Sequence, residues 1–510
     1  MKNNMNLPRF GLCLLGIGSM QALGAQEKAP NIIYIMSDDH ASQAVSAYGG
    51  ILANILPTPN IDRIAKEGVI LNNCFVTNSI STPSRGAIIT GQYSQKNGVY
   101  TLRDKLDPDR QNVAKCMQKA GYQTAIIGKW HLGTEPTGFD YYNVLPGQGR
   151  YYNPLLIEKG MWGDDPRQEK YESREYEGHS TDVITDQAIN FMDRSKGDTP
   201  FFLMCHFKAP HRAWDPAERF KDLLKDVEIP EPANLLDSYE GKGQYASLLK
   251  MSMEHMTERD LKTDIPTGMT RDEHRRWAYQ IYMKDYLRCI AGIDENVGRI
   301  LQYLDENGLA DNTIIIYTAD QGFFLGEHGW FDKRLMYEEC LRMPFVMRYP
   351  KEISSGTVND DIVLNIDFAP LFLDYAGAKA PEEMQGESFR NNLKGNTPAN
   401  WRQSMYYRYW MHADRDHNVT ANYGIRTDRY KLIFYYGEAL GMSGALDVPV
   451  RPADWELYDL ASDPMEMKNI YNDPENKELI KKLKNELLEL KKKYDDEDDK
   501  YPQMKSIVEK

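Results

Sequence analysis

The feature that most constrains the fold is the alternation of short, mostly apolar runs with helical patterns. Four runs stand out: NIIYIM (31–36), QTAIIG (123–128), FFLMCHF (201–207) and NTIIIYT (312–318). Runs of this kind are typical of strands that are buried on both faces. Helical patterns at 181–195 and 286–308 lie between them. The sequence therefore predicts an α/β fold, with a large mixed, mostly parallel sheet sandwiched by helices.

The pattern changes from about residue 400 onward. The segments YGIRTDRYKLIFYYG and DWELYDLASDP predict antiparallel strands joined by turns. A last helix is expected after Asp473-Pro474, with an apolar stripe formed by Leu479, Leu483, Leu487 and Leu490. The acidic stretch at 494–500 is expected to be a solvated tail. The 510 residues are enough for a large domain over 26–395 and a smaller α+β subdomain over 396–510.

The N-terminus has the composition of an export signal. Lys2 and Arg9 precede an apolar run that ends in small residues at Ala25. We therefore expect a signal peptide at 1–25 and a mature chain exported to a bacterial periplasm or secreted; a buried N-terminal helix is the alternative. No other run is long and apolar enough to predict a transmembrane segment.

Composition excludes some partners. The net charge of −14 argues against nucleic acid, because phosphate contacts need a basic face. It does not exclude a small anionic substrate in a locally basic pocket. The five cysteines after residue 25 are sparse and lack metal-ligand spacing, so free core thiols are expected rather than a disulfide framework.

Two of the predicted strands end in oxygen-bearing side chains. Asp38 and Asp39 follow the run at 31–36, and Asp320 and Gln321 follow the run at 312–318. Open α/β sheets bind ligands at the carboxyl ends of their strands. Carboxylate and amide oxygens are the ligands that calcium prefers. Each pair alone could form a solvated turn, but together they predict a cation site.

Three further segments combine imidazole and cationic groups. The members are Lys129 and His131 in GKWHLG, Lys208 and His211 in FKAPHRAW, and His328, Lys333 and Arg334 in GEHGWFDKR. A single His or Lys at such a place is most often structural or solvated. Their recurrence predicts a pocket for a tetrahedral oxyanion.

The stretch NSISTPSRGAIITG (78–91) adds a candidate nucleophile. Pro83 is in a position that favours the first turn of a helix, whose free N–H groups attract an anion. Ser81 has no His or Lys beside it in the sequence. A serine hydroxyl is a poor nucleophile unless a base, a metal or a chemical change activates it.

Taken together, these segments resemble the formylglycine-dependent type I sulfatases of the alkaline phosphatase superfamily, in their bacterial, serine-type carbohydrate-sulfatase form. The family signature is Cys or Ser, any residue, Pro, any residue, Arg, then a spacer and Thr-Gly; it is matched by Ser81, Pro83, Arg85, Thr90 and Gly91. Matching segments, from Asp38-Asp39 to YDLASDP, span nearly the whole chain after residue 25. The resemblance implies an alkaline phosphatase-like sheet and a catalytic domain over 26–395.

The resemblance also implies how Ser81 is activated. A sulfatase-maturating enzyme would oxidise it to formylglycine before export. One hydroxyl of the hydrated aldehyde would attack sulfur and the alcohol would leave. Deprotonation of the second hydroxyl would then release sulfate and restore the aldehyde.

Roles for other residues follow from the same resemblance. The implied catalytic set is Ser81, Arg85, Lys129, His131, His211 and Lys333. One calcium ion would be bound by Asp38, Asp39, modified Ser81, Asp320 and Gln321. His131 is the expected base and His211 the expected acid for the leaving oxygen. Gln321 stands where many relatives have asparagine or histidine.

The implied substrate is a sulfated saccharide from glycosaminoglycan or mucin glycans. We expect exo action, first on 6-O-sulfated N-acetylglucosamine, with galactose or N-acetylgalactosamine sulfates as the alternative. The expected sugar-binding residues are His328, Arg334, His412, Asp414, Arg415 and His417. For the segment at 409–418, a polar surface loop is the competing interpretation.

Two other functions remain open. The first is a phosphohydrolase of the same superfamily that uses unmodified Ser81; Pro83 and Arg85 argue against it, since a maturation enzyme recognises them. The second is an inactive glycan-binding relative. The retained set of Lys129, His131, His211 and Lys333 argues against a pure binding protein.

Overall fold

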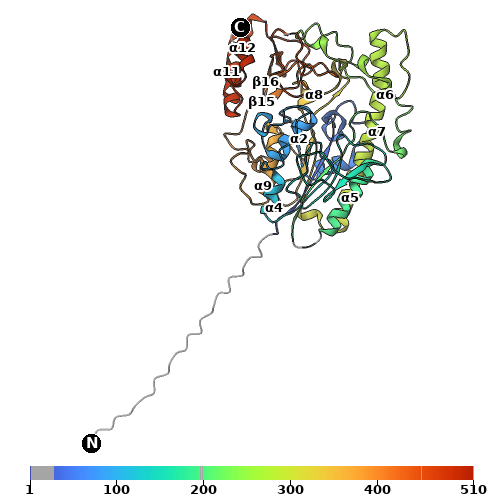
Figure 1. Ribbon diagram of the computed structural model, residues 1–510, viewed down its shortest axis with the longest axis vertical. Helices are drawn as coiled ribbons and strands as arrows, with labels where there is room; N and C mark the ends of the chain where they lie inside the picture. The colour runs from blue at the N-terminus through green and yellow to red at the C-terminus, as the bar shows by residue number, and fades with distance from the viewer. Residues whose placement is uncertain (2–27, 196, 198, 450, 509–510) are drawn as a thin grey trace.

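The computed structural model describes residues 1, 28–195, 197, 199–449 and 451–508 (Figure 1). The expected signal peptide at 1–25 therefore lies, apart from Met1, outside the described residues. Within those ranges, no helix combines the length and apolar character needed to cross a bilayer. The cysteines at 74, 116, 205, 289 and 340 are all free.

The main sheet has ten strands in the order β13-β2-β12-β9-β1-β8-β4-β5-β6-β7. Its four central strands are the four apolar runs: β9 (Thr313–Ala319), β1 (Asn31–Ser37), β8 (Phe201–His206) and β4 (Gln123–Lys129). They are all parallel to one another. The strands outside this core are β2 (Val69–Leu71), β5 (Tyr141–Leu145), β6 (Leu155–Glu158), β7 (Arg174–Glu175), β12 (Phe345–Arg348) and β13 (Thr357–Asn359). Because β12, β6 and β7 pair antiparallel, the sheet is mixed, as predicted.

Helices cover both faces of this sheet. Along β1, Ile32 and Tyr34 pack in one hydrophobic cluster and Ile33 and Ile35 in a second one on the other face. The first cluster includes α2 (Ser81–Thr90), α4 (Val113–Lys119) and α9 (Phe368–Tyr375), and the second includes α1 (Pro59–Lys66), α5 (Ser180–Arg194) and α7 (Arg271–Glu306). Figure 1 shows α4 and α9 on one side of the sheet and α5 and α7 on the other. The predicted sandwich is therefore confirmed.

Helix α7 begins fifteen residues before the predicted start at 286. Its N-cap is Thr270, whose side chain accepts a hydrogen bond from the backbone N–H of Glu273, and the Glu273 side chain accepts one in return. This capping box satisfies two backbone donors and allows a polar first turn. The prediction missed this start because it followed only the apolar spacing.

The second sheet is small and antiparallel, as predicted. Its strands are β15 (Ser404–Tyr409), β16 (Asn422–Thr427), β17 (Tyr430–Tyr435) and β18 (Asp454–Asp459). Helix α11 (Lys477–Lys493) packs on this sheet through its leucine stripe, in which Leu483 and Leu487 are buried (Figure 1). The expected domain boundary at 395/396 falls between α10 (Arg390–Leu393) and β15, and it stays a prediction.

The prediction of a solvated acidic tail is wrong at its centre. Asp496 is fully buried and accepts hydrogen bonds of 2.9 Å from the Arg408 guanidinium on β15. Arg408 in turn lies 3.6 Å over the Trp410 ring. A buried arginine needs a counter-ion, and the tail supplies it.

The remaining α-helices and strands are short. They are α3 (Ser94–Asn97), α6 (Glu258–Leu261), α8 (Glu338–Leu341), α12 (Pro502–Val508), β3 (Cys74–Phe75), β10 (Phe324–Leu325), β11 (Phe331–Asp332) and β14 (Val363–Leu364).

Candidate active site

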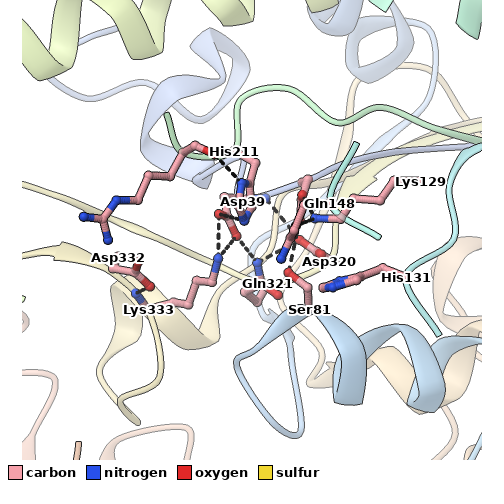
Figure 2. A network of polar contacts seen from close by, with 12 residues as sticks. Asp39, Ser81, Lys129, His131, Gln148, His211, Asp320, Gln321, Asp332 and Lys333 are labelled. Carbon is pink, nitrogen blue, oxygen red and sulfur yellow. Dashed lines mark hydrogen bonds and ion pairs between the residues drawn. The ribbon is translucent and has the colours of Figure 1, made fainter. Parts of the chain in front are cut away.

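The predicted cation ligands meet at the carboxyl ends of the central strands. Asp38 and Asp39 follow β1, and Asp320 and Gln321 follow the neighbouring β9. Carboxylate oxygens of Asp38, Asp39 and Asp320 lie within 4.8 Å of one another, and all three residues are fully buried. Figure 2 shows Asp39, Asp320 and Gln321 directed toward one another. The strand-end pairs therefore form one oxygen-rich cluster.

The cluster has the properties of a site for a hard cation. Burial raises the pKa of Asp39 to about 7 and that of Asp320 to about 6, and repulsion between the carboxylates adds to both shifts. The Gln321 amide nitrogen donates to Asp320 Oδ1 at 2.8 Å, while its Oε1 is buried and accepts no hydrogen bond from any described residue. Three carboxylates fit a calcium-type ion, and a flip of the Gln321 amide would turn its free oxygen toward them.

Ser81 is the first residue of α2, and its Oγ donates to Asp38 Oδ1 at 3.1 Å. Pro83 lies in the first helical turn, as predicted, and all ten residues of α2 are buried. One turn further, Arg85 donates from Nε to Asp320 Oδ2 at 3.1 Å and from Nη1 to the Lys129 carbonyl at 2.6 Å. Helix α2 therefore positions Ser81 beside the carboxylates, and Arg85 fixes it there.

Two lysines reach the same cluster from different elements. Lys129, the last residue of β4, contacts the Asp38 carboxylate and donates to Gln148 Oε1 at 2.5 Å. Lys333 donates to Asp39 Oδ2 at 2.6 Å. Burial opposes ionisation of Asp38, but Lys129, His211 and Arg85 hold its pKa well below its usual range. Both ammonium groups are therefore held beside Ser81 by carboxylates of the cluster.

The two histidines lie on different sides of the cluster. His211 Nε2 is 3.9 Å from Asp39 Oδ2, and the Tyr151 hydroxyl donates to the His211 carbonyl at 2.6 Å. His131 Nδ1 is 3.4 Å from Thr82 Oγ1. Burial, followed by the charge of Lys129, lowers the pKa of both imidazoles well below its usual value. A bound anion would raise these pKa values, because it favours the protonated form.

A second group of charged residues lies next to Lys333. Asp332 contacts Arg334, and His417 lies 3.4 Å from Asp332 Oδ2 and 2.7 Å from Asp414 Oδ1. We call Asp332, Arg334, Asp414 and His417 the charged network. Its members are buried, yet Arg334 Nε and Asp414 Oδ2 have no hydrogen-bond partner among the described residues. The network thus keeps a free donor and a free acceptor.

The comparison with protein families decides the assignment. The sulfatase family model matches residues 30–378, and the C-terminal model of N-sulphoglucosamine sulphohydrolase matches residues 326–493. The chain belongs to the sulfatase family. The enzyme is therefore a sulfuric ester hydrolase.

Individual relatives agree with this assignment. An N-acetylglucosamine-6-O-sulfatase of Bacteroides thetaiotaomicron is 42% identical, over 98% of this chain and 93% of the relative. A solved structure of a protein in complex with its substrate D-glucosamine-2-N,6-O-disulfate superposes with a TM-score of 0.83 at 42% identity, covering 92% of this chain and 99% of that one. A phosphonate monoester hydrolase of Agrobacterium radiobacter, at 20% identity and a TM-score of 0.69 over 91% of this chain and 96% of that one, shares the fold.

Three predicted sugar-binding residues of the enzyme do not join the charged network. His328 is fully buried, with its Nδ1 2.9 Å from Asp237 Oδ2 and its ring packed against Trp330. His412 Nδ1 accepts a hydrogen bond from the Ala421 backbone at 3.1 Å. Arg415 is exposed. Their role in substrate binding stays a prediction.

Sequence reasoning missed two residues that the enzyme brings to the site, Asp332 and Gln148. Asp332 could have been found from the sequence, because it directly precedes the predicted site residues Lys333 and Arg334. Lys208, which the sequence did single out, has its ammonium 4.8 Å from the centre of the Tyr151 ring, and burial lowers its pKa to about 8. Gln148 lies in a glycine-rich loop without any distinguishing pattern.

Proposed function

We propose that the enzyme removes 6-O-sulfate from N-acetylglucosamine at the ends of glycosaminoglycan or mucin chains. The observation that carries this proposal is the charged network beside Lys333. Sugar hydroxyls both donate and accept hydrogen bonds, so a site with a free buried donor and acceptor favours a saccharide over an apolar alcohol. The 42% identical relative, named as an N-acetylglucosamine-6-O-sulfatase, supports the same substrate.

We further propose that Ser81 is oxidised to formylglycine and that Asp38, Asp39, Ser81, Asp320 and Gln321 bind one calcium ion. The aldehyde hydrate would supply a nucleophile with two hydroxyls, and the cation would lower the pKa of a bound hydroxyl and screen the sulfate charge. The buried carboxylates and the free Gln321 oxygen support the ion.

The other side chains of the site have distinct roles in this proposal. Lys129 and Lys333 bind sulfate oxygens. Arg85 holds Asp320 and the backbone of Lys129, the last residue of β4, in place. His211 donates a proton to the leaving sugar oxygen. His131, beside Thr82, accepts the proton that must be removed before sulfate is released.

Calcium should stabilise the protein more at pH 7.5 than at pH 5. The folded, metal-free protein has carboxyl pKa values of about 7 for Asp39 and about 6 for Asp320, above the value of about 4 in an unfolded chain. These two carboxyls therefore bind more protons in the folded than in the unfolded chain, and their contribution to stability falls as pH rises from about 4 to 7. Calcium replaces those protons, so the rise in Tm grows with pH.

Differential scanning calorimetry with calcium and with a chelator measures this effect. The Asp320→Asn variant should lose the calcium-dependent rise, while Asp311→Asn, at an exposed carboxylate, should keep it. A calcium-dependent rise in Tm of equal size at both pH values would contradict the proposed ligand set.

Removing Arg334 should affect sugar substrates selectively. We expect Arg334→Ala to lower kcat/KM on N-acetylglucosamine 6-sulfate by about 10- to 100-fold, because a charged hydrogen bond to the sugar is lost. Hydrolysis of 4-nitrophenyl sulfate, which lacks the sugar, should change only a few-fold. Asp414→Asn, which preserves side-chain shape, should act in the same direction. Arg429→Ala, at an exposed ion pair with Asp459, is the control.

The function itself is tested by measuring sulfate release from a panel of sulfated mono- and oligosaccharides by the matured protein. Activity confined to galactose or N-acetylgalactosamine sulfates would overturn the substrate proposal. Activity of unmodified protein on phosphate esters alone would favour a phosphohydrolase. Binding of sulfated glycans without any hydrolysis would favour the inactive relative.

We also propose that the enzyme is exported after maturation, and that residues 1–25 are removed. N-terminal sequencing of the protein from its bacterial host tests this directly. The mature chain should begin at Gln26 and be found in the periplasmic or secreted fraction, whereas an intact Met1 in the cytoplasm would contradict export.

A further inference from the structure

A pocket of about 220 Å³ adjoins the active site on the side of His131. Thr82 and His131 form part of its wall, together with Arg103, Lys105, Trp162 and Tyr171. In Figure 2, His131 and Lys333 flank Ser81 from opposite sides. The pocket is therefore separate from the charged network, which adjoins Lys333.

The pocket wall carries four charged residues, and three of them have hydrogen-bond or ion-pair partners. The Asp104 carboxylate accepts hydrogen bonds from the backbone N–H groups of Tyr100 and Thr101, at 2.9 and 2.8 Å. Lys105 and Glu169 form an ion pair at 3.7 Å. The fourth residue is Arg103, whose guanidinium has no hydrogen bond or ion pair with any residue that the structure describes. Among the described residues of the pocket wall, Arg103 is therefore the cation without a carboxylate partner.

Packing fixes the stem of Arg103 although its head is exposed. A Cβ atom placed on Gly444 would lie 2.9 Å from Arg103 Cγ, so the aliphatic stem runs along the backbone of the C-terminal subdomain. Arginine side chains often pack their aliphatic part on the protein while the guanidinium stays in water. The Arg103 guanidinium is therefore available to a polar ligand. The pocket volume of about 220 Å³ is below the range of about 300–1,000 Å³ that is typical of pockets for drug-sized ligands. It therefore suits a single substituent or sugar ring.

We propose that this pocket binds a second anionic group of the substrate saccharide, a sulfate or a carboxylate, and that Arg103 is the residue that recognises it. The inference rests on the proposed function, because it assumes that the scissile sulfate lies at Ser81. The partly exposed rings of Trp162 and Tyr171, 5.4 Å apart, supply the apolar wall against which the face of a sugar packs. The enzyme thereby distinguishes multiply charged saccharides from singly sulfated ones.

The test compares three purified substrates with the calcium-loaded, matured enzyme. They are N-acetylglucosamine 6-sulfate, glucosamine 2-N,6-O-disulfate, and a disaccharide in which a uronic acid is linked to 6-sulfated N-acetylglucosamine. For Arg103→Gln we expect KM to rise about tenfold on the substrates whose second anion reaches the pocket, with kcat unchanged. The singly sulfated sugar should be hydrolysed as by the parent enzyme. An effect on the disulfate alone would mean that the pocket binds an anion on the ring that carries the scissile sulfate. An effect on the disaccharide alone would mean that it binds the carboxylate of the neighbouring uronic acid.

Lys105→Gln is the matched control, because it removes the same charge from the same pocket at a residue that is already paired. It should raise KM much less than Arg103→Gln does. Equal losses in both variants, or an equal loss on all three substrates, would overturn the inference. Failure of the proposed function has a different signature: the parent enzyme would then release sulfate from none of the three.

Discussion

Sulfate release should be abolished when Ser81 is replaced by alanine, with kcat falling by at least about 10⁴-fold. The side chain that would become the nucleophile is then absent, while the carboxylates, lysines and histidines around it remain. No other hydroxyl donates to the Asp38 carboxylate in the part of the chain that the structure describes. The measurement is sulfate release under saturating substrate, together with Tm to show that the variant is folded.

Ser84→Ala is the matched control for this variant. Ser84 is also buried in α2, and its hydroxyl donates to the Asp320 carbonyl, so the substitution removes a similar group one turn away. It should cost stability but leave most of the turnover. In the parent protein, the Ser81 peptide should be lighter by the mass of two hydrogens. Full activity of a preparation in which that peptide is unmodified would contradict the proposed nucleophile.

The second large effect is expected for His211→Ala. A positioned acid contributes about 10²- to 10⁴-fold, and its loss matters most when the leaving oxygen is basic. We therefore expect kcat to fall by that amount on N-acetylglucosamine 6-sulfate and far less on 4-nitrophenyl sulfate, whose phenolate leaves without a proton. Steady-state kinetics on the two substrates give the ratio directly.

His131→Ala provides the comparison for that experiment. Its proposed step follows departure of the alcohol, so its loss should reduce kcat on both substrates by similar factors. The 3.4 Å contact with Thr82 places it on the side of Ser81 away from Lys333 (Figure 2). A His211→Ala variant that loses the same factor on both substrates would remove His211 from the role of acid.

Much of the central architecture could be predicted because it depends on local pattern. The runs at 31–36 and 312–318 are apolar throughout most of their length, so their strands and the polar residues that end them follow from burial alone. The pairing of Asp38-Asp39 with Asp320-Gln321 then follows from the geometry of parallel strands. The expected start of α2 at Ser81 rested on Pro83, and the structure confirms it.

What could not be predicted depends on contacts between distant segments. The charged network joins Asp332 to His417, and no periodicity links these positions. Asp496 lies in a run of acidic residues that resembles a solvated tail, and only the buried Arg408 on another element explains its place. Likewise, His328 and His412 carry the right chemistry in the sequence, but His328 pairs with Asp237 and His412 accepts a hydrogen bond from the Ala421 backbone, so neither joins the charged network.

The burial of α2 has a consequence for how active molecules arise. Ser81 is 2% exposed, and every residue of its helix is covered. On this geometry, the proposed oxidation of Ser81 by another enzyme would have to compete in time with folding, during or soon after synthesis. In this proposal, molecules that fold first would keep an unmodified Ser81 and stay inactive. The active fraction of a preparation would then depend on the rate of Ser81 oxidation relative to the rate of folding, and slower synthesis or more maturation enzyme should raise it.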